Sequence, residues 1–206
     1  MPDDTPIATR TIEGFLGSLA HRSPAPGGGA TAAVAGALAA AQASMVVAYS
    51  RGKKSLADHA AAHAEIEAIL ERARADLMDL ADADAIAYAE MNRLQRLPDG
   101  DPERNRLPEA ARACVDVPVR VQEACAAMLD AGGRLAPIAN RWLLSDLAIA
   151  AMLAEATVRC SDRNIRVNAG DLGDAGPAAV DQSGRRCDDA ARAMRSILSA
   201  IDEATG

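Results

Sequence analysis

Aromatic side chains are scarce in this sequence: one Trp, two Tyr and one Phe make up 2% of its 206 residues. No stretch keeps the apolar–polar alternation of a β-strand, and no segment recurs with the period of a repeat protein. Alanine is abundant instead, at about a quarter of the chain, and it has the best helix propensity of any residue. The sequence therefore predicts an all-α fold: one domain over residues 1–206, a bundle of about six helices that includes very long ones.

The sequence also lacks a surplus of positive charge. Its net charge is -7 with a pI near 5.0 and no basic stripe, so we expect no nucleic-acid partner. The N-terminal residues lack the apolar core of a signal peptide, and polar Gln42 and Ser44 interrupt the longest apolar stretch, so we expect no membrane span. The four cysteines have neither CxxC spacing nor a histidine at metal-site spacing, which favours reduced thiols, no metal and a cytoplasmic location. They are Cys114, Cys125, Cys160 and Cys187.

The chain is organised around a glycine-rich stretch and the apolar segment that follows it. Pro24 and Pro26 precede three glycines at positions 27–29, and a helix is expected to open at about Ala30. The free N–H groups at that helix start would point into the glycine loop and form a nest for an anion or a carbonyl group. The alternative is a helix start whose small residues serve only close packing.

The segment from Ala30 to Ser50 is predicted to be one helix with small apolar residues on every side. A helix that is apolar all round is buried, so this one is expected to be central and to lie at the interface of a homodimer. Lys53 and Lys54 follow its end, where cations complement the helix dipole.

A long helix is then predicted to reach about Leu94. Its apolar stripe advances in steps of three and four residues, and Asp84 falls on that stripe. A buried carboxylate must be paired, protonated or functional, and a salt bridge to a neighbouring helix is the alternative to a catalytic role. His59 and His63 are spaced as i, i+4 neighbours and are interpreted as a solvated face. The stripe consists of Ile66, Ile69, Ala73, Leu77, Leu80, Asp84, Ala87 and Met91.

The next helix, about Glu109 to Ala131, contains Pro118, so a kink is expected there, and two glycines are expected to end it. Asp146 then begins an apolar helical face. Asn164 lies eighteen residues later, five turns on, and Asn168 follows it by four. This pattern favours a polar pocket wall; the alternative is that the asparagines cap a helix end.

Together, PAPGGG, GKK, DxxAY, DVP, AN-x4-SD and NIRVN occur in an order and at separations that resemble the cyclodeaminase/cyclohydrolase family. This family contains the C-terminal domain of formiminotransferase-cyclodeaminase and the stand-alone methenyltetrahydrofolate cyclohydrolases. The resemblance covers nearly the whole chain. It implies an all-helical homodimer that acts on a one-carbon adduct of tetrahydrofolate, with no metal and no cofactor beyond that substrate.

Carried over by position, the resemblance implies that Asp84 and Asp146 are catalytic. Asp84 is predicted to be the acid/base, and Asp146 to hold the pterin or to tune Asp84. The two are expected to converge on one pocket with the asparagines on its wall. The substrate-binding residues that it implies are Pro26, Gly27, Gly28, Gly29, Lys53, Lys54, Asn140, Ser145, Asn164 and Asn168.

Three functions stay open at this point. The first is hydrolysis of 5,10-methenyltetrahydrofolate to 10-formyltetrahydrofolate, and the second is formimidoyltetrahydrofolate cyclodeamination, which releases ammonia. Both need an acid/base group with a pKa near neutrality, for which a buried carboxylate is a candidate. The third is folate binding without catalysis, because Ser55 and Leu56 stand where many relatives carry lysine and tyrosine. A helical interaction bundle without folate binding is the least specific interpretation.

Overall fold

The structure, a computed structural model, describes residues 5–22 and 25–205, so Pro24 of the proline-rich approach lies outside the described residues. No β-strand occurs within these ranges, and the prediction of an all-α fold is confirmed. The short 3-10 helices include η1 (Ile7–Thr9), η2 (Lys54–His59), η5 (Arg141–Leu143) and η6 (Ala169–Ala175). The α-helices are α1 (Ile12–Ala20), α2 (Gly28–Ser50), α3 (Ala60–Gln95), α4 (Leu107–Leu135), α5 (Leu144–Asn168) and α6 (Gly176–Thr205).

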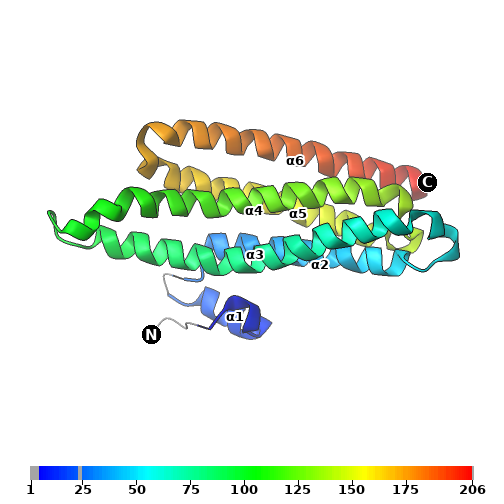
Figure 1. The fold of residues 1–206 in the computed structure, drawn as a ribbon, viewed down its shortest axis with the longest axis horizontal. Coiled ribbons are helices and arrows are strands. Elements are labelled where there is room, and N and C mark those ends of the chain that lie inside the picture. Colours follow the sequence, from blue (N-terminus) through cyan, green and yellow to red (C-terminus); the bar gives the residue numbers. More distant parts are fainter. Residues whose placement is uncertain (1–4, 23–24, 206) are drawn as a thin grey trace.

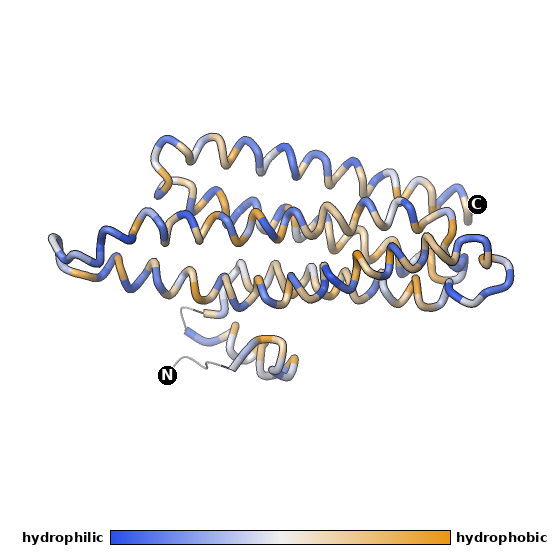
Figure 2. The backbone as a smooth tube through the Cα atoms, viewed as in Figure 1, coloured by the Kyte–Doolittle hydropathy of each residue, from blue (hydrophilic) through white to orange (hydrophobic). Residues whose placement is uncertain are grey.

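Helices α2 to α6 run along one long axis, and the short α1 lies beside this bundle (Figure 1). Helix α2 packs against both α3 and α5, while α4 packs against α3, α5 and α6. The two helices that carry the predicted catalytic carboxylates, α3 and α5, therefore both contact α2. In Figure 2 the connection between α2 and α3 and the start of α4 are hydrophilic, as expected for exposed ends of a bundle.

The small residues of α2 allow its neighbours to approach closely. Gly36 faces the core, and a Cβ atom there would lie 3.2 Å from Cys125 Sγ and 3.2 Å from both methyl carbons of Leu77. Alanines along the same side are fully buried, among them Ala33 and Ala40. Side chains of α3 and α4 therefore fill the space that larger residues on α2 would otherwise occupy.

Within one chain, helix α2 is buried on several sides and leaves one apolar face uncovered. Leu38 is 58% exposed and Tyr49 is 63% exposed, and they lie eleven residues, about three turns, apart along one face. By length and composition alone α2 could cross a membrane, but 56% of its most apolar window is buried inside the bundle. A core helix with one uncovered apolar face accounts for both observations.

Packing overturns two expectations, one about the end of α4 and one about His63. The glycines at the end of α4 do not end it; the helix continues to Leu135, and a Cβ on Gly132 would lie 3.2 Å from Ile197 Cδ1 of α6. Of the histidine pair, His59 is exposed as expected but His63 is not. His63 is 1% exposed, and its Nε2 atom lies 2.9 Å from the carbonyl oxygen of Ile138, so it links α3 to the segment before Asn140.

Candidate active site

The Asp84 carboxylate lies at the N-terminus of α2. Its Oδ2 atom accepts a hydrogen bond of 3.1 Å from the backbone N–H of Ala30, fifty-four residues away in the sequence. The first N–H groups of a helix have no partner within the helix and form the positive end of its dipole, so this position suits a negative charge. Asp84 therefore combines a half-buried setting in α3 with an electrostatic partner from α2.

Two opposing effects set the proton affinity of this carboxyl. Burial raises the pKa of Asp84, and the hydrogen bond from Ala30 lowers it; burial is the larger effect, so the pKa lies above the ordinary value of 3.8. A carboxylate whose pKa is raised in this way is a better proton acceptor than an exposed one. The half-buried position of Asp84 on its helix is thus consistent with a functional role for this carboxyl.

Of the three glycines, Gly29 is the one that this carboxylate requires. A Cβ atom on Gly29 would lie 1.9 Å from Asp84 Oδ1, far below the 3.0 Å under which real Cβ contacts essentially never occur. A Cβ on Gly28 would lie 3.3 Å from Asn164 Oδ1, whereas a Cβ on Gly27 would meet nothing within 4 Å. The sequence predicted a nest for an external anion; in the structure Asp84 accepts from the Ala30 N–H.

Helices α4 and α5 complete this first cluster. Asn164 reaches the glycine loop from α5, and Asn168, one turn later, donates from Nδ2 to the carbonyl oxygen of Cys114 on α4 at 3.1 Å. Burial, followed by the charge of Asp84, raises the pKa of the Cys114 thiol, so thiol and carboxylate are close enough to interact. We call Gly28, Gly29, Ala30, Asp84, Cys114, Asn164 and Asn168 the α2-start cluster.

A second polar cluster lies at the other end of α2. Lys53 Nζ donates to Asn140 Oδ1 at 2.8 Å, and the backbone N–H of Asn140 donates to Ser50 Oγ at 2.8 Å. Asn140 Nδ2 donates to the carbonyl oxygen of Tyr49 at 3.3 Å, so the amide fixes the lysine against the end of α2. Of the other residues assigned by resemblance, Lys54 is exposed and so is Ser145. We call Ser50, Lys53 and Asn140 the α2-end cluster.

Asp146 lies between these two clusters. Its Oδ1 accepts a hydrogen bond of 2.7 Å from Gln42 Nε2. Gln42 is twelve residues after Ala30, which places the two carboxylates about 18 Å apart along α2 at 1.5 Å per residue. The expected convergence of Asp84 and Asp146 therefore does not occur within one chain.

The reason for this error lies in helix geometry. Asn164 returns to the face of Asp146 after eighteen residues, as the spacing predicted, but it also lies about 27 Å further along the helix. Sharing a face does not bring two residues together. Gln42 was a missed signal, because it is a polar side chain within an apolar helix and such a residue usually has a partner.

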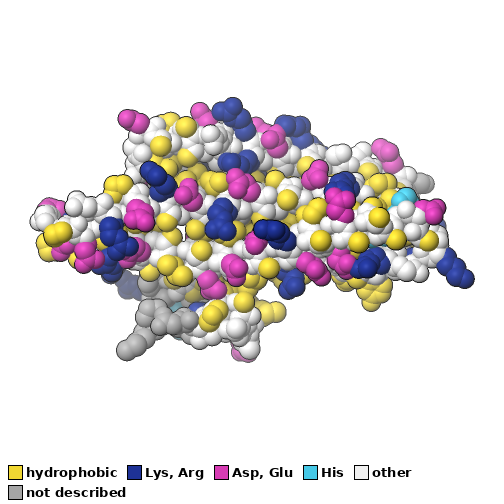
Figure 3. Space-filling model, in the orientation of Figure 1, with side chains coloured by type: hydrophobic (Ala, Val, Ile, Leu, Met, Phe, Trp, Pro, Cys, Tyr) yellow, Lys and Arg dark blue, Asp and Glu magenta, His cyan; other side chains and the backbone are white. Residues whose placement is uncertain are grey.

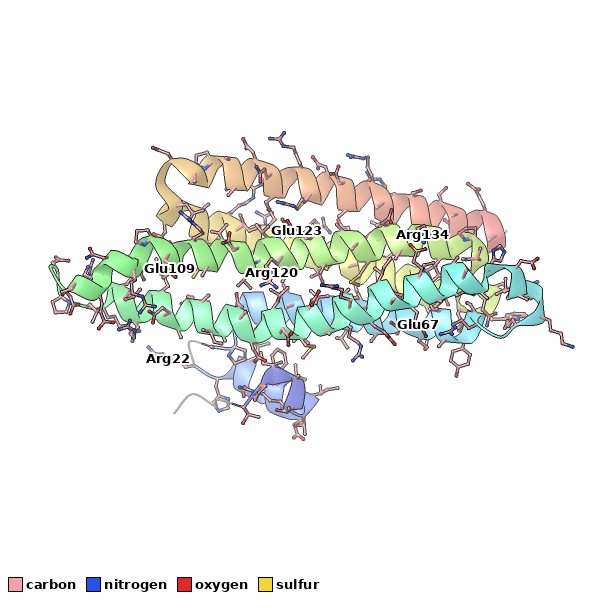
Figure 4. The ribbon with its side chains drawn as sticks, viewed as in Figure 1. Arg22, Glu67, Glu109, Arg120, Glu123 and Arg134 are labelled. Carbon is pink, nitrogen blue, oxygen red and sulfur yellow. The ribbon has the colours of Figure 1, made fainter. Side chains whose placement is uncertain are left out.

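The outer face formed by α3 and α4 has a different character. Figure 3 shows Lys, Arg, Asp and Glu side chains mixed across it, and Figure 4 places Arg120, Glu123 and Arg134 along α4. Arg134 pairs with Glu65 at 2.8 Å, and water screens this exposed pair. This face is a solvated surface. Among residues 5–22 and 25–205, no group of three or more His, Cys, Asp or Glu residues is placed to hold a metal ion.

The fold and the α2-start cluster define the class of this protein: an antiparallel helical bundle with a half-buried carboxylate against the glycine-rich start of a central helix. Residues 11–183 match the family described as formiminotransferase-cyclodeaminase. The chain belongs to this family, as the resemblance of its motifs had indicated.

Individual relatives cover the chain to different extents. Formimidoyltransferase-cyclodeaminase of Mus musculus is 34% identical over 182 residues, which is 84% of this chain but 34% of that protein, so this chain spans about a third of its length. Methenyltetrahydrofolate cyclohydrolase of Methylorubrum extorquens is 32% identical over 172 residues, covering 80% of this chain and 81% of that protein. The crystal structure of formiminotetrahydrofolate cyclodeaminase from Thermotoga maritima has a TM-score of 0.84 at 26% identity, covering 95% of this chain and 98% of that one.

Proposed function

We propose that this protein hydrolyses 5,10-methenyltetrahydrofolate to 10-formyltetrahydrofolate. The observation that carries the proposal is the Asp84 carboxyl, which combines a raised pKa with a position at the start of α2. The choice of reaction follows the relative named methenyltetrahydrofolate cyclohydrolase, which matches this chain over most of both lengths. The substrate supplies the one-carbon unit, and the proposed reaction uses no further cofactor.

The chemistry suits a single buried carboxylate. The substrate carries a positively charged amidinium carbon between N5 and N10, and the negative charge of Asp84 attracts it. Asp84 accepts a proton as a water molecule attacks that carbon and the C–O bond forms. The bond from the carbon to N5 then breaks and N5 receives the proton held by Asp84. The carbon-bound hydroxyl loses its remaining proton to solvent and becomes the carbonyl of the formyl group, which stays on N10. Asn164 lies beside the glycine loop, where its amide can meet the polar edge of the pterin.

Cyclodeamination is the second candidate, favoured by the Thermotoga maritima cyclodeaminase whose fold covers nearly all of this chain. There N10 would attack the formimino carbon and ammonia would leave, and Asp84 would again transfer the proton. Both candidates are tested by supplying each synthetic adduct and following the methenyl absorbance. Loss of that absorbance when wild-type protein, but not Asp84→Asn, is added to the methenyl adduct supports the hydrolase. Gain of it from the formimino adduct supports the deaminase, and tight binding with neither change supports binding without catalysis.

The functional unit proposed here is a homodimer, and the support is the uncovered apolar face of α2 and α5. Leu38 and Tyr49 on α2 and Ile149 and Met152 on α5 are each about half exposed or more. Contiguous exposed side chains of this kind are typical of an interface, and a closed dimer pairs the same surface of both copies. A second copy of the chain is therefore the proposed occupant of this face.

An antiparallel pairing of the two α2 helices would bring the separated carboxylates together. Ala30 lies eight residues before Leu38, which is an exposed residue close to the middle of α2, and Gln42 lies four residues after it. A two-fold axis near Leu38 would reduce the separation of Asp84 from the partner's Asp146 along the helix from about 18 Å to about 6 Å. The partner's Lys53 would lie about 10 Å beyond Asp84, where it can meet the glutamate tail of folate.

Mixing two inactive variants tests this arrangement. Asp84→Asn and Asp146→Asn dimers should each be inactive, whereas a mixture allowed to exchange subunits should recover about one quarter of wild-type activity. Half of the dimers would then be mixed, and each of these would have one intact site. No recovery, or a stable monomer in sedimentation at micromolar concentration, would reject the shared site.

We also propose a cytoplasmic location, which suits the four free thiols.

A further inference from the structure

Pro118 leaves a gap in the hydrogen-bond ladder of α4. The helix runs without interruption from Leu107 to Leu135, and Pro118 lies buried in its middle. In an α-helix each N–H donates to the carbonyl four residues earlier, and proline has no N–H. The carbonyl of Cys114 therefore has no donor from its own helix. Cys114 is a buried residue, so a carbonyl left without a partner there would be costly.

Asn168 supplies the missing donor from another helix. It is the last residue of α5, and its Nδ2 atom donates to the carbonyl oxygen of Cys114 at 3.1 Å across fifty-four residues of sequence. The side-chain amide thus takes the place of the backbone N–H that Pro118 lacks. Two motifs that looked independent in the sequence, DVP and NIRVN, meet at this one carbonyl.

The contact lies beside the proposed acid/base. The charge of Asp84 acts on the Cys114 thiol, and Asn164, one turn before Asn168, reaches the glycine loop. Cys114 also belongs to a small apolar cluster that joins α4 to the end of α3 that follows Asp84. A bond at the Cys114 carbonyl therefore fixes α4 and α5 on two sides of the carboxylate.

We propose that Asn168 is a positioning residue and not a substrate ligand: its amide caps the carbonyl that Pro118 leaves open and thereby holds α4 and α5 around Asp84. The contact itself does not depend on the proposed reaction, whereas its catalytic consequence rests on that function. One measurement therefore tests the Asn168 contact, and a second measurement tests its effect on catalysis.

The first measurement is a double-mutant cycle on the free energy of unfolding. Asn168→Ala in the wild-type background should increase the unfolding equilibrium constant on the order of tenfold, since it leaves a buried carbonyl unpaired. In the Pro118→Ala background the new backbone N–H can reach the Cys114 carbonyl. Asn168→Ala should therefore increase the unfolding equilibrium constant there by about threefold or less. Equal losses in both backgrounds would overturn the proposal.

Matched variants keep the cycle decisive. Asn164 lies one turn away on the same helix. Asn164→Ala should lower the free energy of unfolding by the same amount in the wild-type background and in the Pro118→Ala background. Asn168→Asp keeps the size of the side chain but removes the donor, so it should be at least as destabilising as Asn168→Ala when Pro118 is present. If Pro118→Ala fails to fold, this comparison decides: an Asn168→Asp variant as stable as wild type would overturn the proposal.

The second measurement distinguishes positioning from substrate contact. Loosening α4 and α5 should expose Asp84 to water, and because burial raises its pKa, the acid limb of the kcat–pH profile should move to lower pH in Asn168→Ala. The KM for the folate adduct should change by about twofold or less, and adding Pro118→Ala should restore the acid limb. If Asn168 instead contacts the substrate, Asn168→Ala should raise KM strongly in both backgrounds and leave the acid limb in place. That result would overturn the proposal. If wild type turns over neither adduct, the proposed function fails, and the unfolding cycle still decides the role of Asn168.

Discussion

Replacing Gly29 with alanine tests the candidate site with the smallest change that the chain allows. The added Cβ would lie 1.9 Å from Asp84 Oδ1, 2.3 Å from Cγ and 2.6 Å from Oδ2. Gly29 is fixed within the first turn of α2, so the carboxylate must move away. In doing so it loses the 3.1 Å hydrogen bond from Ala30. The substitution therefore displaces the proposed acid/base without changing its chemical identity.

The expected magnitudes separate activity from stability. A hydrogen bond to a charged group is worth about 1.5–3 kcal/mol, but alanine is favoured over glycine in a helix by up to about 1 kcal/mol, and a displaced carboxylate regains contact with water. The net change in the free energy of unfolding should therefore be small, about 1 kcal/mol. Loss of a positioned acid/base typically lowers the rate about 10²–10⁴-fold, so kcat should fall by at least the lower value.

The assay is the disappearance of the methenyl absorbance, with melting temperature measured on the same samples. Gly133→Ala is the matched control, because it adds the same methyl group inside a helix, outside both polar clusters, where nothing lies within 4 Å. Gly28→Ala, which would meet Asn164 Oδ1 at 3.3 Å, should give an intermediate effect. If Gly29→Ala keeps a kcat within about threefold of Gly133→Ala, Asp84 is not the group that transfers the proton.

Three more variants extend the test to charge, packing and substrate. Asp84→Asn should abolish turnover yet raise the free energy of unfolding at pH 7. Because the pKa of Asp84 is raised in the folded state, lowering the pH through that pKa should stabilise wild type relative to the variant. Melting curves between pH 4 and 8 would show this change. Gly36→Leu should cost about 1–3 kcal/mol, because Leu77 and Cys125 already fill the space; an unchanged melting temperature contradicts this close packing. Lys53→Ala should raise KM more for polyglutamylated than for monoglutamyl folate, and equal changes for both substrates leave the lysine only its bond to Asn140.

The helical periodicities of the sequence were enough to predict the all-α fold and to place Asp84 on a buried stripe. These are local properties, because a step of three or four residues decides which side of a helix is covered. The position of Asp84 against the glycine loop was not local. It depends on how far α3 slides along α2, and the sequence constrains that only through the missing Cβ of Gly29. That glycine was interpreted as room for a ligand, when the room is taken by a side chain of the protein.

The assignments at Asp146 and Asn168 required information that one helix cannot supply. Asp146 shares a helix face with Asn164, but the rise along the helix separates the two, and only the contact with Gln42 shows where Asp146 lies. Asn168 matched a block that the family resemblance associates with substrate, while its partner is a carbonyl whose lack of a donor follows from Pro118. Pro118 and Asn168 are fifty residues apart in the sequence, and nothing in that spacing shows that their helices meet.

The setting of Asp84 balances two requirements that oppose each other. Burial alone would raise the pKa of the carboxyl until it stayed protonated and could not accept a proton, whereas hydrogen bonding alone would lower the pKa and weaken it as a base. Here one N–H from the start of α2 opposes burial without outweighing it, so the pKa lies above 3.8. Any change that adds a second donor or admits water should therefore weaken the base, and any change that removes the Ala30 contact should leave it protonated more of the time. The close approach permitted by Gly29 and the restraint proposed for Asn168 on α4 both act on this balance. A methyl group at Gly29 is therefore expected to lower kcat more than it lowers stability, whereas loss of the Asn168 amide is expected to move the acid limb of the kcat–pH profile as well as to lower stability.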